Sequence, residues 1–283
     1  MSSIRAVVVF ALVVLMTVVL MPVQIVATIA GSRLAVRLPL LWHAIASRLM
    51  RIRVVVRGAM AMDRPVLFVC NHISWLDIIV MGKALPACFV AKSEVASWPF
   101  FGRLAKLQRS VFIERRRHAT ANHRDTLQQR LEAGDNLILF AEGSSGDGIH
   151  ILPFKSGLLA VAERRIDGRA LTVQPVTIAY SRVDGVPALR SQMPGLAWYG
   201  DLDLVPHLWG ILTGGPIVAE LVMHAPVTLD QFGSRKALST YCRERIVEGM
   251  SEILSGRPGP AGGRAAEAPV APDVAVSAAL ADS

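Results

Sequence analysis

The sequence predicts an α/β fold, with a mixed, largely parallel sheet flanked by helices and an N-terminal membrane helix or helical hairpin in front of it. From residue 53 onward, short β-rich runs alternate with polar or amphipathic stretches, which is the pattern of a sheet covered on both faces. Before that point lies a long uncharged segment. We therefore expect a membrane-anchoring segment (1–52), a catalytic domain (53–255) and a disordered tail (256–283) that is rich in Gly, Pro and Ala.

The composition indicates contact with a membrane and with anions. The hydrophobic fraction is 52% and the mean hydropathy is +0.43, both high for a soluble enzyme. The net charge of +8 and the pI near 10.0 favour polyanionic partners, which include anionic lipid, coenzyme A phosphates, acidic carrier proteins and nucleic acid. The three cysteines lack CxxC spacing, so neither a disulfide framework nor a thiolate zinc site is expected.

The first element is an apolar run long enough to cross a bilayer. Residues 6–31 carry no charge, and Pro22 is expected to kink the helix they form. Because only Arg5 precedes the run and five arginines follow it by residue 53, the positive-inside bias places the rest of the chain in the cytoplasm. A cleaved signal peptide is the alternative. Residues 38–50 show helical spacing and are expected to form an interfacial helix or a second membrane segment.

The remaining elements follow from short apolar runs bounded by turn residues. Helices are expected at 117–133, 156–166 and 235–254. Strands are expected at 54–58, 65–70, 87–92, 110–115, 136–142, 172–180 and 217–227.

The segment "CNHISWLD" (70–77) is the first candidate for chemistry. It reads as the end of a buried strand that delivers Asn71 and His72, a turn at Ser74, and a helix that begins near Trp75. Ligands of open α/β sheets collect outside the carboxyl ends of strands. If the turn folds back, Asp77 can reach one imidazole nitrogen and fix the tautomer, so that His72 acts as a general base. The spacing alone is a weak pattern, since a histidine after a strand is also an ordinary turn or core residue.

Two further strand ends carry polar groups that can share this rim. Residues 110–117 end in Arg115 and two more arginines, and residues 136–148 end in Glu142, Gly143 and Ser144. Each has a structural alternative: a solvated basic face for the arginines, a helix cap or an ion pair with Arg115 for Glu142, and a plain turn for Gly143.

These ordered segments resemble the glycerolipid acyltransferase family, the PlsC-like 1-acylglycerol-3-phosphate acyltransferases and their relatives. That family is marked by NHxxxxD, a GxxFIDR-like strand, FPEGTRS and a later strand that contains Val and Pro. The matching segments here span about residues 53–225 and are "NHISWLD" (71–77), "SVFIER" (110–115), "FAEGSS" (140–145) and "VQPVTIA" (173–179), with "PFKSG" (153–157) as a further likeness.

The resemblance implies transfer of a fatty acyl group from acyl-CoA or acyl-carrier protein to a lysolipid hydroxyl in phospholipid biosynthesis, with 1-acylglycerol-3-phosphate as the acceptor. It implies that His72 removes the hydroxyl proton, that Asp77 orients His72, and that no cofactor beyond the acyl donor is needed. The residues implied to bind substrate are Asn71, Arg115, Glu142, Gly143, Ser144 and Lys155.

One departure from the family pattern bears on the acceptor. Ser145 stands where the family has an arginine, and a serine cannot reproduce a bidentate phosphate contact. Lys155 or Arg116 can substitute, or the acceptor lacks a phosphomonoester. Parts of the sequence also resemble bacterial members that acylate lyso-ornithine lipid, so that acceptor stays an alternative.

Other classes fit the sequence less well. A nucleic-acid-binding protein is contradicted by the uncharged run and the 6% aromatic content. A serine hydrolase lacks a GxSxG elbow, and a non-enzymatic scaffold would tolerate loss of His72. No zinc-type spacing and no Walker or GxGxxG motif occurs, so we expect no metal.

Overall fold

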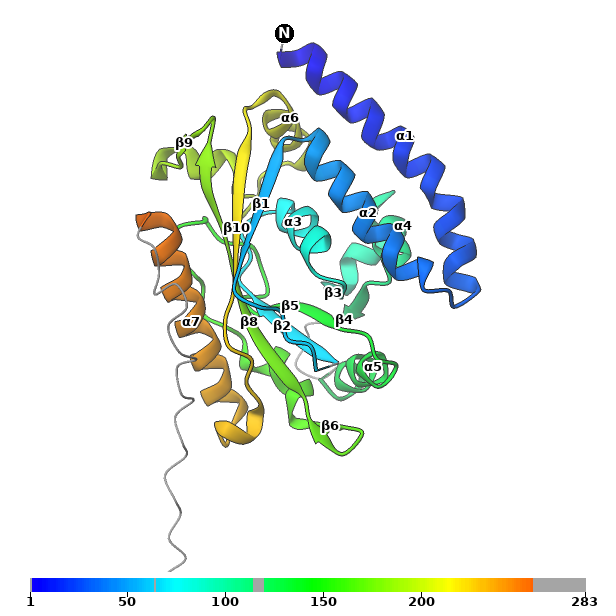
Figure 1. Ribbon diagram of the computed structural model, residues 1–283, viewed down its shortest axis with the longest axis vertical. Helices are drawn as coiled ribbons and strands as arrows, with labels where there is room; N and C mark the ends of the chain where they lie inside the picture. Colours follow the sequence, from blue (N-terminus) through cyan, green and yellow to red (C-terminus); the bar gives the residue numbers. More distant parts are fainter. Residues whose placement is uncertain (1, 64, 114–119, 257–283) are drawn as a thin grey trace, which may run out of the picture.

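The computed structural model describes residues 2–63, 65–113 and 120–256. Figure 1 shows a sheet seen nearly edge-on, with helices on both of its faces and the first two helices along one flank. The tail predicted to be disordered lies outside the described residues from position 257 on.

The sheet has eight strands within the described part of the chain, and its order is β1-β10-β8-β2-β5-β3-β4, with β9 paired to β8. Strands β8, β2, β5, β3 and β4 run parallel to one another, whereas β10 is antiparallel to β8 and parallel to β1. The predicted fold class, a mixed and largely parallel sheet with flanking helices, is confirmed. The strands are β1 (Ile52–Arg57), β2 (Val66–Cys70), β3 (Cys88–Lys92), β4 (Val111–Ile113), β5 (Leu137–Phe140), β8 (Thr172–Val183), β9 (Val186–Pro187) and β10 (Ile217–Met223).

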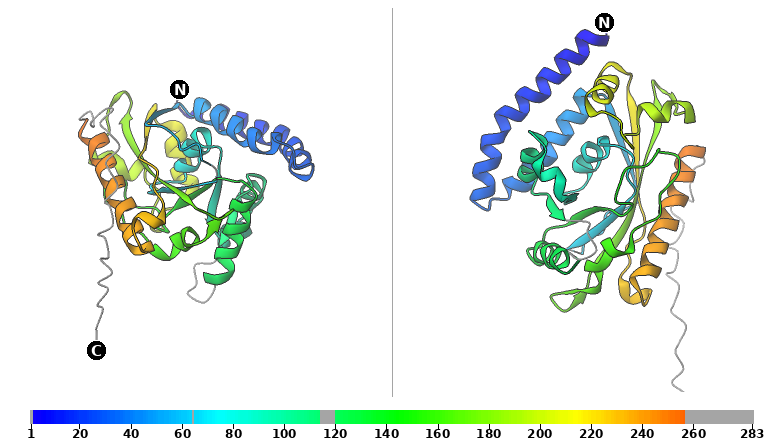
Figure 2. Two further views of the ribbon diagram at one scale, coloured as in Figure 1. Left: turned by 60° about the horizontal axis from the view of Figure 1, so that its bottom comes forward. Right: turned by 180° about the vertical axis from the view of Figure 1, so that it is seen from behind.

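Helices cover both faces of this sheet, as Figures 1 and 2 show from opposite sides. Helix α7 lies along β8 on one face, and α2 and α3 lie on the other. All five residues of β2 are buried, as a strand covered on both faces requires. The helices are α1 (Ser2–Ile29), α2 (Leu34–Leu49), α3 (Leu76–Ala84), α4 (Phe101–Leu107), α5 (Thr120–Glu132), α6 (Leu204–Thr213) and α7 (Arg235–Ser255), and short 3-10 segments lie at Ser93–Ser97, Ser156–Glu163, Arg190–Gly195 and Leu229–Gln231.

Helices α1 and α2 pack side by side as a hairpin (Figure 1). The Trp42 indole N–H donates to Thr17 Oγ1 at 2.9 Å, which ties the two helices together at mid-length. Within the described residues, one helix is long and apolar enough to cross a membrane by length and composition, and it covers Ser3–Ile29 with a mean hydropathy of 2.9. Most of its large apolar side chains are exposed, so its outer surface suits lipid.

The last helix has clear start and stop signals. The Ser234 side chain accepts a hydrogen bond from the N–H of Ala237, which caps the N-terminus of α7. At the other end Gly256 has φ +65°, the left-handed conformation that commonly terminates helices.

The prediction of a helix over 156–166 is wrong in its last three residues. The segment forms a 3-10 helix that ends at Glu163, and residues 165–166 instead pair with 169–170 in a small hairpin. The turn between them is Asp167-Gly168, and both residues have positive φ, as a two-residue type I′ turn demands. The apolar run "LLAVA" at 158–162 lacks the helical spacing of an amphipathic α-helix, and its last four residues are buried.

Candidate active site

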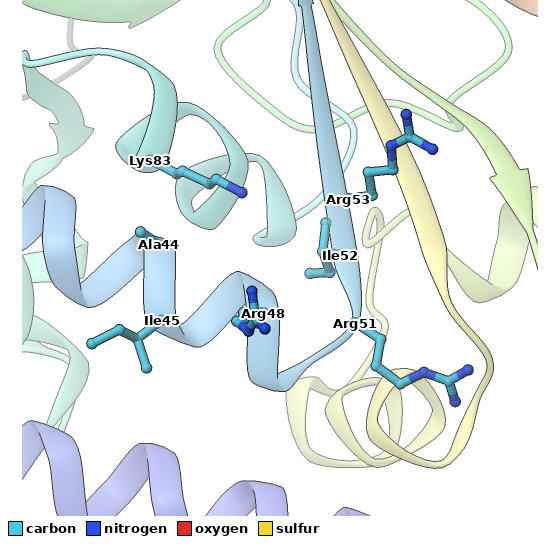
Figure 3. Close-up of a pocket in the computed structure, with 7 residues that line it drawn as sticks. All are labelled: Ala44, Ile45, Arg48, Arg51, Ile52, Arg53 and Lys83. Carbon is cyan, nitrogen blue, oxygen red and sulfur yellow. The ribbon is translucent and has the colours of Figure 1, made fainter.

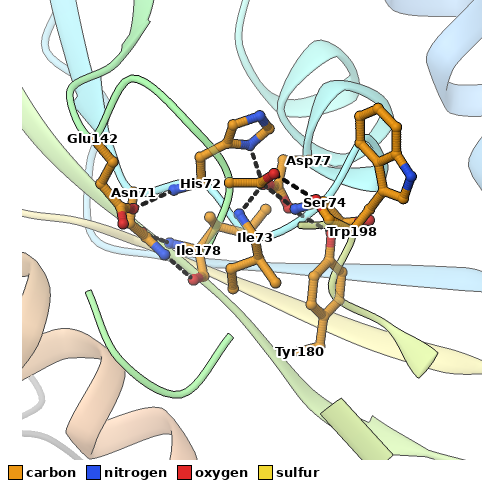
Figure 4. Close-up of polar contacts among 10 residues, drawn as sticks. Asn71, His72, Ile73, Ser74, Asp77, Glu142, Ile178, Tyr180 and Trp198 are labelled. Carbon is orange, nitrogen blue, oxygen red and sulfur yellow. Dashed lines mark hydrogen bonds and ion pairs between the residues drawn. The ribbon is translucent and has the colours of Figure 1, made fainter. Parts of the chain in front are cut away.

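His72 lies two residues beyond the end of β2, at the rim of the sheet (Figure 4). The neighbouring parallel strand β5 ends level with it, because Cys70 and Phe140 are direct partners in the register. The segment after β5, which begins at Ala141, therefore runs past His72. The predicted meeting of these two strand ends is present in the structure.

Asp77 lies in the first turn of α3 and reaches back to His72. Its Oδ2 is 2.7 Å from His72 Nδ1, and the same oxygen accepts the backbone N–H groups of Ile73 (2.6 Å) and Ser74 (3.0 Å). Asp77 is fully buried, whereas the His72 side chain is about 20% exposed. A carboxylate that already accepts two N–H groups also acts as an acceptor toward the ring, so we assign the imidazole proton to Nδ1. Nε2 then carries the lone pair of a general base.

The imidazole is also held from the side by an aromatic ring. Phe140, the last residue of β5, stacks on His72 with ring centroids 4.1 Å apart and planes inclined by 16°. This stacking contacts the face of the ring and not its edge, where Nε2 lies.

The turn that carries His72 is clamped by backbone contacts from two loops. The N–H of Gly146 donates to the His72 carbonyl at 2.8 Å, and the N–H of Trp198 donates to the Ile73 carbonyl at 3.0 Å. The Ser145 hydroxyl donates in turn to the Trp198 carbonyl, which joins the two loops. These hydrogen bonds hold the backbone of His72 and Ile73 in place and so help to fix the position of the imidazole ring.

Tyr180 holds the other oxygen of Asp77 and is a residue that the sequence analysis missed. Its hydroxyl donates to Asp77 Oδ1 at 2.6 Å, and both side chains are fully buried (Figure 4). Burial, reinforced by the charge of Asp77, raises the pKa of Tyr180 well above its ordinary value, so the phenol stays protonated as a donor. Tyr180 thus positions the carboxylate that positions His72.

We expect Tyr180→Phe to lower kcat about 5-fold with little change in KM. The variant removes one charge-assisted hydrogen bond from Asp77 but no group that can touch substrate. Steady-state kinetics and thermal unfolding of both proteins check this. A change confined to unfolding temperature, with kcat intact, would mean that Tyr180 is only a core residue.

Glu142 is buried beneath His72 and holds its backbone. Glu142 Oε1 accepts the N–H of His72 at 2.7 Å, and Oε2 accepts the N–H of Leu152, also at 2.7 Å. Burial raises the pKa of Glu142 to about 7, against the opposing effect of these two N–H groups. The structure gives Glu142 a supporting contact with His72; its predicted contact with substrate stays a prediction.

The raised pKa of Glu142 predicts a pH-dependent stability. Between its ordinary value of 4.5 and about 7, the folded state binds more protons at this group than the unfolded state, so its contribution to the free energy of unfolding falls as pH rises. We expect wild type to lose about 2 kcal/mol relative to Glu142→Gln across this interval. Urea unfolding of both proteins at the two ends of the interval measures the difference, and parallel pH curves would contradict the shift.

Asn71 has a structural role. Its Nδ2 donates to the carbonyl of Ile178 and its Oδ1 accepts the N–H of the same residue, both at 2.9 Å. The side chain is 1% exposed and joins the end of β2 to β8. Both of its polar groups are therefore engaged inside the protein, and its predicted contact with substrate stays a prediction.

Gly143, Ser144 and Lys155 lie around the end of β5. Gly143 has φ +77°, a left-handed conformation that favours glycine, and a Cβ built there would lie 2.8 Å from the flexible end of Lys155, at Nζ. Ser144 and Lys155 are exposed. These three predicted residues are thus together beside the loop that carries His72, whereas Arg115 and Arg116 lie outside the described residues.

Among the described residues no cluster of three His, Cys, Asp or Glu side chains is arranged to hold a metal ion.

Comparison with known proteins identifies the family. A family model described as Acyltransferase matches residues 51–179. The chain is 38% identical over 250 residues to a lyso-ornithine lipid O-acyltransferase of Rhizobium meliloti, covering 87% of this chain and 86% of that one. The chain belongs to the glycerolipid acyltransferase family. The predicted family and the predicted activity, acyl transfer by a lysolipid O-acyltransferase, are confirmed at the level of this family.

Two further relatives of this acyltransferase are informative. It is 34% identical over 160 residues to a 1-acyl-sn-glycerol-3-phosphate acyltransferase of Neisseria gonorrhoeae, covering 55% of this chain and 58% of that one. The crystal structure of the 1-acyl-sn-glycerophosphate acyltransferase PlsC from Thermotoga maritima superimposes with a TM-score of 0.64 at 22% identity, covering 92% of this chain and all of that one. At that identity the likeness shows the shared fold.

Proposed function

We propose that this acyltransferase moves a fatty acyl group from the thioester of acyl-CoA or acyl-carrier protein to the free hydroxyl of a lysolipid, with His72 as the general base. The contact that carries the proposal is the 2.7 Å pair of His72 Nδ1 and Asp77 Oδ2, which presents Nε2 at the rim of the sheet. Residues 53–255 would form the acyltransferase domain and residues 1–52 its membrane anchor.

The proposed reaction is a single direct transfer. Nε2 of His72 takes the proton of the acceptor hydroxyl while that oxygen attacks the thioester carbonyl. A C–O ester bond forms, the C–S bond breaks, and the imidazolium returns its proton to the leaving thiolate. Asp77 stabilises the imidazolium during the transfer, so no acyl-enzyme is required.

1-Acylglycerol-3-phosphate is the acceptor that the family resemblance first suggests, and a relative with that name supports it. Its phosphate would be bound by cations, for which the candidates are Lys155, beside the end of β5, and Arg115, which lies outside the described residues. Gly143 and Ser144 would shape the same subsite. A cationic side chain can bind the phosphate through charge-assisted hydrogen bonds.

Lyso-ornithine lipid is the second candidate acceptor, and a specific contact favours it. Ser145 stands where the family has an arginine, and its hydroxyl is engaged with the Trp198 carbonyl. The side chain therefore supports a loop and offers no bidentate contact for a phosphate. The longer of the two sequence matches reported above, to the Rhizobium meliloti enzyme, is to a protein named for this acceptor. Ornithine lipid carries an amino acid in place of a phosphate.

An acceptor panel tests the proposal. Purified full-length protein is incubated with labelled acyl-CoA or acyl-carrier protein, and with lysophosphatidic acid or lyso-ornithine lipid in mixed micelles. We expect labelled diacyl product from at least one acceptor, and the ratio of kcat/KM values identifies the preferred one. Folded protein that acylates neither acceptor with either donor would contradict the proposed function.

We also propose that the enzyme works on the cytoplasmic face of the bacterial inner membrane. The candidate membrane helix Ser3–Ile29 and the arginines that follow it support this orientation. A lysolipid would then reach His72 from the bilayer, and the soluble donor would approach from the cytoplasm.

A further inference from the structure

A pocket of about 540 Å³ lies where α2, α3 and the start of β1 meet, apart from the residues around His72. Figure 3 shows Lys83 extending from α3 toward β1 and Arg48 at the end of α2, on the same side of the strand. Arg51 and Arg53 also belong to the lining, and Figure 3 shows their guanidinium groups on the other side of β1. We call this site the basic pocket.

The four cations of the basic pocket lack carboxylate partners. Within residues 2–63, 65–113 and 120–256, none of them lies within 4.0 Å of an Asp or Glu oxygen. Among the other basic side chains of the described residues, eight have such a partner, while others, including Arg169 and Lys236, also lack one. The paired cations are Arg57, Lys92, Arg109, Arg130, Arg164, Arg165, Arg235 and Arg245. The basic pocket differs in that four such side chains line one site, which favours the binding of an anion.

The lining of the basic pocket is amphipathic. The lining also includes the apolar residues Ala44, Ile45 and Ile52, and Ile45 is 37% exposed. Helix α2 carries Ile45 and packs against the apolar helix α1, so the pocket adjoins the surface suited to lipid. A water-soluble anion has no use for such an apolar lining, whereas a phospholipid has both a phosphate and apolar chains.

Arg51, between α2 and β1, has an unusual backbone conformation. Arg51 has φ +59°, a left-handed conformation between α2 and β1 that glycine adopts at less cost. Arg51 lines the pocket at the junction of α2 and β1.

We propose that the basic pocket binds the phosphate headgroup of an anionic membrane phospholipid, which fixes the base of the helical hairpin to the membrane surface. This lipid is a bound component of the membrane, separate from the acceptor that meets His72. The proposal therefore stands whichever lysolipid the enzyme acylates.

A binding experiment on the full-length protein in neutral detergent micelles tests the proposal. The probes are fluorescent phosphatidylglycerol and, for reference, fluorescent phosphatidylcholine, followed by anisotropy. The test variant is R48Q/K83Q. The matched control is R169Q/K236Q, which also removes one Arg and one Lys; both residues are exposed and lie outside the pocket lining. We expect R48Q/K83Q to bind phosphatidylglycerol about 30-fold more weakly than wild type. We expect R169Q/K236Q to bind like wild type, and phosphatidylcholine to bind weakly to all three.

The charge-conserving variant R48K/K83R keeps the test decisive if R48Q/K83Q folds poorly, because it should retain phosphatidylglycerol binding. The proposal fails if R48Q/K83Q binds phosphatidylglycerol like wild type, or if R169Q/K236Q weakens binding equally. Displacement of phosphatidylglycerol by coenzyme A would assign the pocket to the donor, and displacement by inorganic phosphate at similar concentration would assign it to a free anion. Either displacement overturns the proposal.

Discussion

His72→Ala is expected to lower kcat about 10³-fold while the protein stays folded. The loss follows because the substitution removes the only group that the mechanism uses to take the hydroxyl proton, and general-base catalysis contributes about 10²- to 10⁴-fold. Folding should survive, because Asp77 keeps its hydrogen bonds from Ile73, Ser74 and Tyr180 after the imidazole is gone. A buried carboxylate that keeps three donors is not left unsatisfied.

The measurement is steady-state acyl transfer, with thermal unfolding recorded on the same preparations. His150→Ala is the matched control. His150 Nδ1 lies 2.8 Å from Asp147 Oδ2, so it forms a similar pair, but its side chain is 74% exposed. We expect this control to keep near wild-type kcat. A folded His72→Ala protein with wild-type turnover would remove the proposed mechanism.

Asp77→Asn is expected to lower kcat about 100-fold. The amide oxygen can take the place of Oδ2 and accept from the ring and the two N–H groups, and the NH₂ group then faces the Tyr180 oxygen, which can accept. The tautomer of His72 is therefore kept, but the negative charge that stabilises the imidazolium is lost. A hydrogen bond to a charged group is worth up to about 3 kcal/mol, which corresponds to about 100-fold in rate.

Kinetics measure the effect of Asp77→Asn on catalysis, and urea unfolding measures its effect on stability. Because the substitution keeps the shape and the hydrogen-bond count of the buried cluster, we expect its free energy of unfolding to fall by no more than about 1–3 kcal/mol. KM should change little, since Asp77 is fully buried and touches no substrate. A variant that is folded and raises KM with kcat intact would place Asp77 in binding.

The contact of His72 and Asp77 was predictable from sequence because every determinant is local. A buried apolar run ends, a turn follows, and a carboxylate stands in the first turn of the next helix, where it can fold back. Neighbouring parallel strands also predicted that the segment with Glu142 would meet His72, and the register of β2 and β5 bears this out. Both inferences need only strand direction and a few residues of spacing.

The contact of Tyr180 with Asp77 was not predictable, because the two residues are separated by 103 positions and meet only through the register of the sheet. Strand β8 pairs with β2 from Thr172 to Val176 and then continues past its end, which brings Tyr180 under the turn. The hydrogen bonds of Asn71 were not predictable for the same reason, because its partner is Ile178 on the part of β8 that extends beyond β2. A strand that is predicted to be longer than the strand beside it is the signal for such contacts, because its extra residues lie next to the turn after the shorter strand.

The most direct test of the account is a double-mutant cycle on His72→Ala, Asp77→Asn and the double variant, with kcat measured in one assay. If Asp77 acts only through His72, its charge has no role once the imidazole is absent, and the double variant will be no slower than His72→Ala. If the two losses multiply instead, so that the double variant is a further 100-fold slower, Asp77 acts independently of His72 and the proposed base pair is wrong.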